Sequence, residues 1–218
     1  MGTDSIGAYE EHAQNFLQCR DASKVGVQVV NRWAQSLKPG AEVMEIACGG
    51  GLPVTRTLVD EGLKIWAIDS SPTLVNVFKD RFPDVPVQCG TVLESDYFRK
   101  KYDAAIAIGL IFLLSEKDQI EMLNRVSEVL RPAARFLFTA PVEVGTWMDV
   151  NTGHACKSLG RDVYETALKQ SGFRVAGFYE DSGKNNYYEA EKSLARRREM
   201  QPDRRMKSDA DAGRQGAK

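Results

Sequence analysis

The chain has 218 residues, of which 43% are hydrophobic and 27% are charged, and its formal net charge is −1. A chain of this length is expected to form one domain with a core large enough to hold a central sheet. The balanced charge excludes a general electrostatic attraction to nucleic acid or to membrane surfaces, and no apolar run reaches the length of a membrane span.

The four cysteines and the first ten residues bear on the cellular compartment. No two cysteines form a C-x-x-C pair, so the sequence indicates neither a zinc site nor a thioredoxin-like site. The first ten residues lack the basic start and the apolar centre of a signal peptide. We therefore expect a cytoplasmic protein with reduced thiols and no metal site.

Two helical segments are predicted before the first strand. Residues 5–20 have apolar side chains near helical spacing and predict a helix or an ordered lead segment. Asp21–Leu37 is predicted as a second helix with Asp21 as its N-cap, and Lys38-Pro39-Gly40 ends it. We expect residues 1–24 to form a helical cap on a main domain that spans residues 25–191.

Short apolar runs then alternate with segments that can form helices. Ser71 followed by Pro72 is typical of a helix start, and Ser115 three residues before Asp118 is a capping box. Because turns separate the alternating segments, they predict a parallel sheet with helices on both faces. The five predicted strands are Val43–Ala47, Leu63–Ile68, Val85–Cys89, Tyr102–Ile108 and Arg135–Ala140.

The C-terminal third departs from this alternation. Pro141–Leu159 is predicted as a long loop, and Arg161–Ser171 as a helix. Phe173–Tyr179 and Tyr187–Ala190 predict two further strands joined as an antiparallel hairpin. Arginines and small polar residues dominate after the hairpin, so residues 192–218 are expected to form a disordered, charged tail.

The strongest signal for a ligand lies after the first strand. Val43–Ala47 leads into Gly49-Gly50-Gly51, and Asp69 follows the second strand, 20 residues beyond Gly49. Ligands of open parallel sheets bind at the carboxyl ends of the strands, where all these residues fall. An acidic residue at this distance is placed to accept hydrogen bonds from the two hydroxyls of a ribose. We therefore expect a ligand that contains adenosine.

The glycine loop does not match the phosphate-binding motifs. The third glycine of the dinucleotide motif G-x-G-x-x-G would fall at Val54, and Pro53 removes a backbone N–H near the start of the helix. The chain also lacks the Gly-Lys-Ser or Gly-Lys-Thr ending of a Walker loop. A nucleotide-dependent oxidoreductase is thus a less favoured alternative.

The segment Glu45–Gly51, with the sequence EIACGGG, resembles the first motif of class I S-adenosylmethionine-dependent methyltransferases, (D/E)-x-G-x-G-x-G. The resemblance covers about residues 25–190 and implies a three-layer, Rossmann-like α/β sandwich. Its seven-stranded, mostly parallel sheet would have the order 3-2-1-4-5-7-6. Other stretches similar to family motifs are Asp69, Thr91-Val92, Asp103–Gly109, Leu130-Arg131-Pro132 and Arg135–Phe138.

Two departures from the family pattern stand out. Ala47 replaces the first glycine of the motif, and the small methyl group leaves cofactor binding expected. The segment Gly109–Leu114 lacks the Asn-Pro-Pro-Tyr motif of many enzymes that methylate exocyclic amines of nucleic-acid bases. A nucleic-acid substrate is therefore disfavoured, and a small-molecule acceptor is expected.

The resemblance implies roles for individual residues around the cofactor. The loop would surround the methionine part, Asp69 and Ser70 would hold the ribose, and residues after the next two strands would enclose the adenine. The implied cofactor-binding residues are Glu45, Ala47, Gly49, Gly51, Asp69, Ser70, Thr91, Val92 and Ile108.

Candidates for the acceptor side come from the predicted covers of the sheet. His154 is the candidate general base, because it titrates near neutrality and lies in a glycine-flanked loop after a strand. A structural hydrogen bond within that loop is an equally good interpretation of His154. The candidate substrate-binding residues are Tyr9, His12, Phe16, Trp147, Asn186 and Tyr188.

The sequence thus predicts a cytoplasmic enzyme that transfers a methyl group from S-adenosylmethionine to O, N or C of a small molecule and leaves S-adenosylhomocysteine. The in-line displacement needs alignment of the reacting atoms more than it needs a base. A noncatalytic S-adenosylmethionine-binding or regulatory protein is the alternative from another functional class. We expect a monomer or homodimer without a nucleic-acid or membrane partner.

Overall fold

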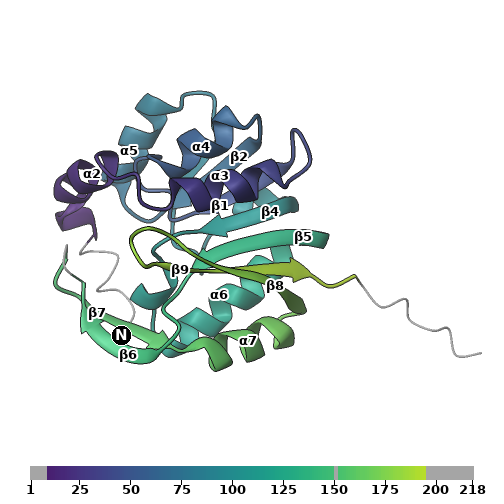
Figure 1. Cartoon of the computed structure of the whole chain (residues 1–218). Coiled ribbons are helices and arrows are strands. Elements are labelled where there is room, and N and C mark those ends of the chain that lie inside the picture. Colours follow the sequence, from purple (N-terminus) through teal and green to yellow (C-terminus); the bar gives the residue numbers. More distant parts are fainter. Residues whose placement is uncertain (1–8, 150–151, 195–218) are drawn as a thin grey trace, which may run out of the picture.

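One seven-stranded sheet forms the centre of the computed structural model, which describes residues 9–149 and 152–194 (Figure 1). The strand order is β3-β2-β1-β4-β5-β9-β8; the first five strands are parallel, and β9 is antiparallel to both of its neighbours. Counted along the chain within this sheet, the order is the expected 3-2-1-4-5-7-6. The strands are β1 (Glu42–Ile46), β2 (Lys64–Asp69), β3 (Val87–Cys89), β4 (Tyr102–Ala107), β5 (Leu130–Thr139), β8 (Phe173–Glu180) and β9 (Asn186–Lys192).

Alternating side chains of the strands pack against two helical layers. In β1, Val43 packs in a cluster with Trp33 of α3 and Leu58 of α4, whereas Met44 packs on the opposite face with Leu123 of α6. This period of two is that of a strand buried on both faces, so the three-layer sandwich is confirmed. The helices are α2 (Ala13–Asp21), α3 (Val27–Gln35), α4 (Val54–Asp60), α5 (Pro72–Arg81), α6 (Glu116–Val129) and α7 (Arg161–Gln170), with short 3-10 turns η1 (Tyr97–Arg99) and η2 (Ile111–Leu113).

The two predicted helix caps are confirmed. The Oγ of Ser71 accepts a hydrogen bond from the backbone N–H of Leu74 at 3.1 Å, at the start of α5. The Oγ of Ser115 accepts one from the N–H of Asp118 at 3.2 Å, at the start of α6. Each hydroxyl satisfies a backbone donor that has no partner within its own helix.

The prediction of one helix from Asp21 to Leu37 is wrong. Asp21 ends α2, and α3 begins at Val27 after Gly26, which has a φ of 85°. A Cβ on Gly26 would lie 2.3 Å from the hydroxyl of Tyr187. The left-handed backbone and this close approach both need glycine, and together they separate the two helices.

The segment after β5 is also not the predicted loop. Residues Val144–Met148 (β6) and Ala155–Leu159 (β7) pair antiparallel as a separate hairpin. The hairpin does not show the usual alternation, since most side chains of β6 are exposed on both faces. Figure 1 places it beyond the main sheet, below α2 in the view. In addition, β5 begins at Leu130 directly after α6, five residues before the predicted start at Arg135.

The predicted disordered tail lies outside the described residues from position 195 onward, as do residues 1–8 of the predicted N-terminal cap. In the parts of the chain that the structure describes, no helix is both long enough and apolar enough to cross a membrane.

Candidate functional site

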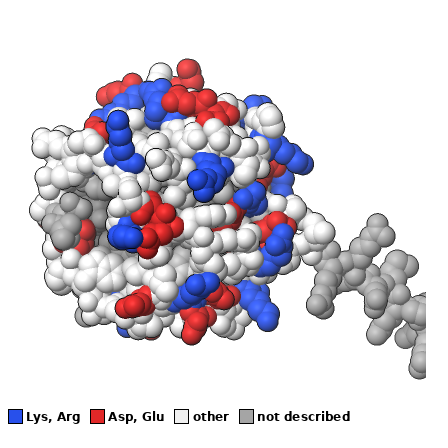
Figure 2. Space-filling model, viewed as in Figure 1, with Lys and Arg blue, Asp and Glu red and all other residues white. Residues whose placement is uncertain are grey.

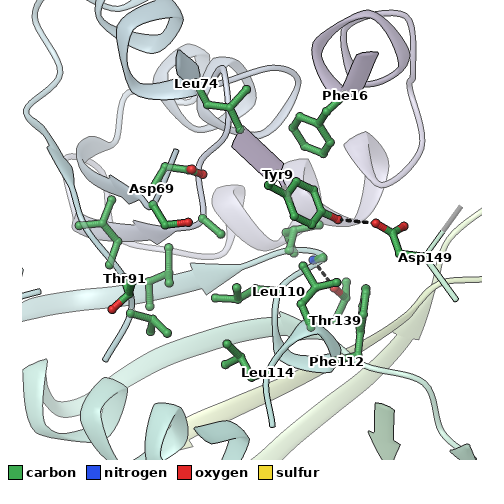
Figure 3. A pocket seen from close by; sticks show the side chains of 18 of the residues that line it. Tyr9, Phe16, Asp69, Leu74, Thr91, Leu110, Phe112, Leu114, Thr139 and Asp149 are labelled. Carbon is green, nitrogen blue, oxygen red and sulfur yellow. Dashed lines mark hydrogen bonds between the residues drawn. The ribbon is translucent and has the colours of Figure 1, made fainter. Parts of the chain in front are cut away.

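A cavity of about 590 Å³ opens at the carboxyl ends of the parallel strands (Figure 3). One side is formed by the ends of β1, β2 and β4 and by the residues after β3. The other side is formed by the N-terminal segment and the β6–β7 hairpin. Residues from the strand ends include Ala47, Asp69, Ser70, Thr91, Val92, Ile108 and Thr139; residues from the cover include Tyr9, Phe16, Arg20, Asp149 and Asn185.

Asp69 is the acidic side chain that the sequence places at the end of β2. Its Oδ2 accepts a hydrogen bond from the N–H of Gly49 at 2.7 Å, and its Oδ1 accepts one from the N–H of Ser71 at 2.9 Å. Each carboxylate oxygen keeps a further lone pair for a ligand hydroxyl. Burial raises the pKa of Asp69, while the backbone hydrogen bonds oppose this shift. The carboxylate is therefore fixed in orientation at the cavity wall.

The glycine loop turns sharply behind this wall. Ala47 lines the cavity with a φ of 57°, the left-handed conformation that glycine adopts without strain. A Cβ on Gly51 would lie 2.3 Å from Cε2 of Phe82, and a Cβ on Gly49 would lie 3.0 Å from Cε1 of Phe16. Neither glycine is among the residues that line the cavity. In this structure they allow close packing of α5 and of the Phe16 ring against the loop.

Glu45 lies deeper, beside a small adjoining cavity of about 30 Å³. It is 3% exposed, and its Oε2 accepts a hydrogen bond from the hydroxyl of Thr55 at 2.7 Å. Burial raises the pKa of Glu45 to about 8, and the negative charge of Asp69 adds to this shift. Arg20 lines both cavities, and its Nη1 donates to the carbonyl of Val25 at 3.5 Å. Burial lowers the pKa of Arg20.

The wall after β3 is a short turn. The Oγ1 of Thr91 accepts the N–H of Glu94 at 3.1 Å and donates to Oε2 of the same residue at 3.1 Å. Val92 and Leu93 give this wall an apolar surface, and Ile108 faces the cavity from the end of β4. The Oγ1 of Thr139 accepts the N–H of Gly109 at 2.7 Å (Figure 3).

The cover is joined by a contact between its two parts. The hydroxyl of Tyr9 donates to Oδ2 of Asp149 at 3.2 Å, which joins the N-terminal segment to the end of β6 (Figure 3). The ring of Tyr9 packs edge-on against Phe16, with centroids 5.5 Å apart. Next to it, the carboxylate of Glu10 accepts hydrogen bonds from the hydroxyl of Thr73 at 2.6 Å and from the hydroxyl of Ser71. The N-terminal segment is thus held both to α5 and to the hairpin.

Several sequence-predicted residues lie elsewhere. His12 is exposed and precedes α2 as its N-cap residue. Trp147 does not line the cavity, but its ring packs at 5.4 Å against Phe112, which does. His154 also lies outside the lining. Its backbone N–H donates to the hydroxyl of Thr152 at 3.3 Å, and its buried Nε2 has no hydrogen-bond partner among the described residues.

The strand β9 presents different residues to the cavity from those predicted. Tyr188 is fully buried and stacks on Phe138 with ring centroids 5.1 Å apart. The carbonyl of Asn186 accepts the N–H of Ala140 at 3.1 Å. The neighbours Asn185 and Tyr187 line the cavity instead. The sequence predicts the hairpin, but the residues that line the cavity each lie one position before the selected ones.

Residues that sequence reasoning missed come mainly from the cover and from the turn after β4. Arg20 falls within a predicted helix, and its helical spacing alone does not distinguish it from other charged residues there. Phe112 and its neighbours belong to an apolar run whose residues all have the same character, so the pattern cannot tell lining residues from core residues. These missed lining residues are Arg20, Leu110, Phe112, Leu113 and Leu114.

Comparison with known families bears directly on this site. Residues 43–133, which run from β1 through the glycine loop and Asp69 into β5, match the family model described as "Methyltransferase domain". This segment of the chain is similar to a methyltransferase domain. The matched segment supplies most of the strand-end side of the cavity, whereas Thr139 and the cover lie outside the matched residues.

Solved structures of methyltransferases share the fold of this chain. A 1,6-didemethyltoxoflavin-N1-methyltransferase from Burkholderia thailandensis aligns with a TM-score of 0.68 at 16% identity, over 88% of this chain and 87% of that chain. A magnesium protoporphyrin IX methyltransferase from Synechocystis PCC 6803 aligns with a TM-score of 0.62 at 16% identity, over 77% and 78%. The amino pentose methyltransferase CalS10 from Micromonospora echinaspora aligns with a TM-score of 0.64 at 14% identity, over 77% and 90%. A search of curated proteins gave no match.

Proposed function

We propose that this protein transfers a methyl group from S-adenosylmethionine to a small-molecule acceptor. The observation that carries the proposal is Asp69, which holds a buried carboxylate at the edge of a 590 Å³ cavity at the strand ends. The match of residues 43–133 to the methyltransferase family model supports the same assignment. The acceptor atom is oxygen, nitrogen or carbon.

The residues present fit the chemical groups of this cofactor. Asp69 has lone pairs left for the ribose hydroxyls, and Val92 and Leu93 offer an apolar surface to the adenine. Arg20 lines both cavities and Glu45 lines the smaller one, so the guanidinium is available to the carboxylate of an amino acid and the carboxyl group of Glu45 to its ammonium. The volume falls within the range of about 300–1,000 Å³ that is usual for small-molecule sites. The bound cofactor supplies an electrophilic methyl group on a sulfonium.

The protein's part in such a reaction is alignment and exclusion of water. The strand ends hold one ligand through backbone-anchored groups, and the Tyr9–Asp149 contact covers the cavity from the other side. Holding two reactants in line lowers the barrier without a base. The proposal that His154 acts as general base meets one difficulty, because His154 does not line the cavity. We therefore expect His154→Ala to retain most of its turnover.

The distribution of surface charge also favours a small-molecule acceptor over a nucleic acid. On the face seen in Figure 2, acidic and basic side chains are interspersed, with no continuous basic track that would follow a nucleic-acid backbone. The three enzymes with similar folds named above are described as methyltransferases of 1,6-didemethyltoxoflavin, magnesium protoporphyrin IX and an amino pentose. Within this proposal the protein acts in the cytoplasm as a monomer or homodimer.

Methyl transfer is tested by incubating the protein with S-adenosylmethionine and a panel of small amines, phenols, carboxylates and carbon acids, and measuring release of S-adenosylhomocysteine. Release that depends on one acceptor class supports the enzyme and identifies the atom. Tight cofactor binding without release for any class favours the alternative, a noncatalytic S-adenosylmethionine-binding protein. The His154→Ala variant, assayed with the acceptor found, decides the role of that residue.

A further inference from the structure

Three consecutive residues before β4 have a left-handed backbone. Tyr97, Phe98 and Arg99 have φ values of 50°, 56° and 52°. L-residues other than Asn and Asp rarely adopt this conformation, and runs of it are unfavourable because each Cβ crowds the following carbonyl. Strain of this kind persists only where surrounding contacts hold it, and it clusters at functional sites.

The contacts that hold this turn converge on Tyr97. Its N–H donates to the Oγ of Ser95 at 3.0 Å, and its carbonyl accepts the hydroxyl of Tyr102 at 2.9 Å. The N–H of Phe98 donates to Oδ1 of Asp96 at 3.0 Å. The Tyr97 side chain is 1% exposed, and the guanidinium of Arg125 lies over its ring, 5.7 Å from the centroid. The turn therefore directs one large side chain into the interior.

The hydroxyl of Tyr97 ends at the wall of the cavity. It donates to the carbonyl of Val92 at 2.6 Å, and Val92, Leu93 and Glu94 all line the cavity. This wall belongs to no helix or strand, so the regular hydrogen bonds of the sheet do not fix it. Burial raises the pKa of Tyr97 to about 12, so the hydroxyl stays a donor at any physiological pH.

We propose that the left-handed turn at residues 97–99 sets the position of the wall at Val92–Glu94, and that Tyr97 is a positioning residue for the adenine end of the bound cofactor. This inference rests on the proposed function, because it assigns a ligand group to that wall. A right-handed turn over the same residues would direct the ring elsewhere and leave the Val92 carbonyl without this donor.

The test compares two Tyr→Phe variants that each lose one buried hydroxyl. Tyr97→Phe removes the donor to Val92. Tyr164→Phe removes a hydroxyl that donates to Oε1 of Gln119 at 2.7 Å and accepts the N–H of Leu159 at 3.1 Å, and Tyr164 does not line the cavity. Both variants are titrated with S-adenosylhomocysteine in a calorimeter. Tyr97→Phe is expected to bind about 10-fold more weakly than wild type, which corresponds to the loss of one net hydrogen bond. Tyr164→Phe is expected to bind within about twofold of wild type.

Further measurements separate positioning from folding. Ser95→Ala removes the acceptor of the Tyr97 N–H and should weaken binding in the same direction, so the inference stays testable if Tyr97→Phe folds poorly. With an acceptor in hand, the KM for S-adenosylmethionine should rise in Tyr97→Phe while kcat stays unchanged. Equal affinity of wild type and Tyr97→Phe would overturn the positioning role of Tyr97, and so would an equal loss of affinity in Tyr97→Phe and Tyr164→Phe. Either result would leave the proposed function standing. Failure of the wild type to bind S-adenosylhomocysteine overturns the proposed function as well.

Discussion

The two sides of the cavity are built by different means. On the strand-end side, Asp69 is anchored by N–H groups of Gly49 and Ser71, and parallel pairing fixes the strands that carry these residues. On the cover side, Tyr9 reaches a partner 140 residues away in the sequence through one side-chain hydrogen bond. A wall fixed by backbone hydrogen bonds is expected to be rigid, whereas a wall held by a few side chains opens at a lower free-energy cost.

This difference assigns separate tasks to the two sides. The rigid side is suited to a ligand that is always the same, because its groups keep one geometry. The cover is suited to admitting and enclosing an acceptor, because breaking few contacts is enough to open it. Substitutions on the strand-end side should change cofactor affinity, and substitutions in the cover should change the rates of entry and release.

The largest effect is expected from Asp69→Asn. Loss of the charge should weaken the binding of S-adenosylhomocysteine by about 100-fold, since hydrogen bonds to a charged group contribute roughly 1.5–3 kcal/mol each. Calorimetry measures the change. Asp60→Asn, at an exposed position at the end of α4, is the matched control and should bind like the wild type. Equal affinity of Asp69→Asn and wild type would contradict the assignment of the ribose to this side.

A second prediction concerns pH and Glu45. Its pKa in the folded protein is about 8, above the ordinary value of 4.5, so its contribution to stability is complete below pH 4.5 and is lost as the pH rises through 8. Glu45→Gln should therefore gain stability relative to wild type between pH 5 and pH 9, by roughly 4 kcal/mol, given about 1.4 kcal/mol per pKa unit over about three pH units. Urea unfolding of both proteins at the two pH values measures this gain. A stability difference that is constant with pH rules out a raised pKa at Glu45.

A smaller effect is expected in the cover. Tyr9→Phe should speed the dissociation of S-adenosylhomocysteine about fivefold, as for loss of about 1 kcal/mol of net hydrogen bonding. Stopped-flow measurement in a double-mutant cycle with Asp149→Asn isolates the contact. The Tyr9 substitution should have little further effect once Asp149 is replaced. Fully additive effects of the two substitutions would show that the Tyr9–Asp149 contact does not hold the cover.

The smallest effect concerns the one residue that departs from the glycine motif. Ala47 has a φ of 57°, so Ala47→Gly should relieve strain. Glycine also gives the unfolded chain more conformational entropy, which offsets part of this relief. The net gain in the free energy of unfolding is expected to be about 0.5–1 kcal/mol. Urea unfolding measures it. Ala22→Gly serves as the opposite control, because Ala22 has a φ of −80° and should lose stability as glycine. A loss of stability in Ala47→Gly would contradict the argument from backbone strain.

The strand-end side was predictable from the sequence because its signals are local. A short apolar run, a glycine turn and an acidic residue after the next strand each occupy a few consecutive positions, and parallel pairing then brings them together. Asp69, Thr91, Val92 and Ile108 therefore line the cavity as expected. Ala47 could be noticed as a departure, but its left-handed backbone is visible only in the structure.

The cover could not be predicted in the same way, because its contacts join distant parts of the chain. The hairpin at β6 and β7 lacks the alternation that identifies a strand, so it was expected as a loop. His154 and Trp147 lie in this hairpin. Their side-chain chemistry and their place in the predicted loop made them candidates, but neither lines the cavity. The one-residue error at Tyr188 has another cause, since the neighbouring strand residues Tyr187 and Tyr188 face opposite sides of β9.

We propose above that the strand-end side binds the adenosine and amino-acid parts of S-adenosylmethionine. Calorimetric titration of the wild-type protein with S-adenosylhomocysteine and, separately, with NAD tests it most directly. We expect saturable binding of S-adenosylhomocysteine with one site per chain and no measurable binding of NAD. Binding of NAD without binding of S-adenosylhomocysteine would contradict it.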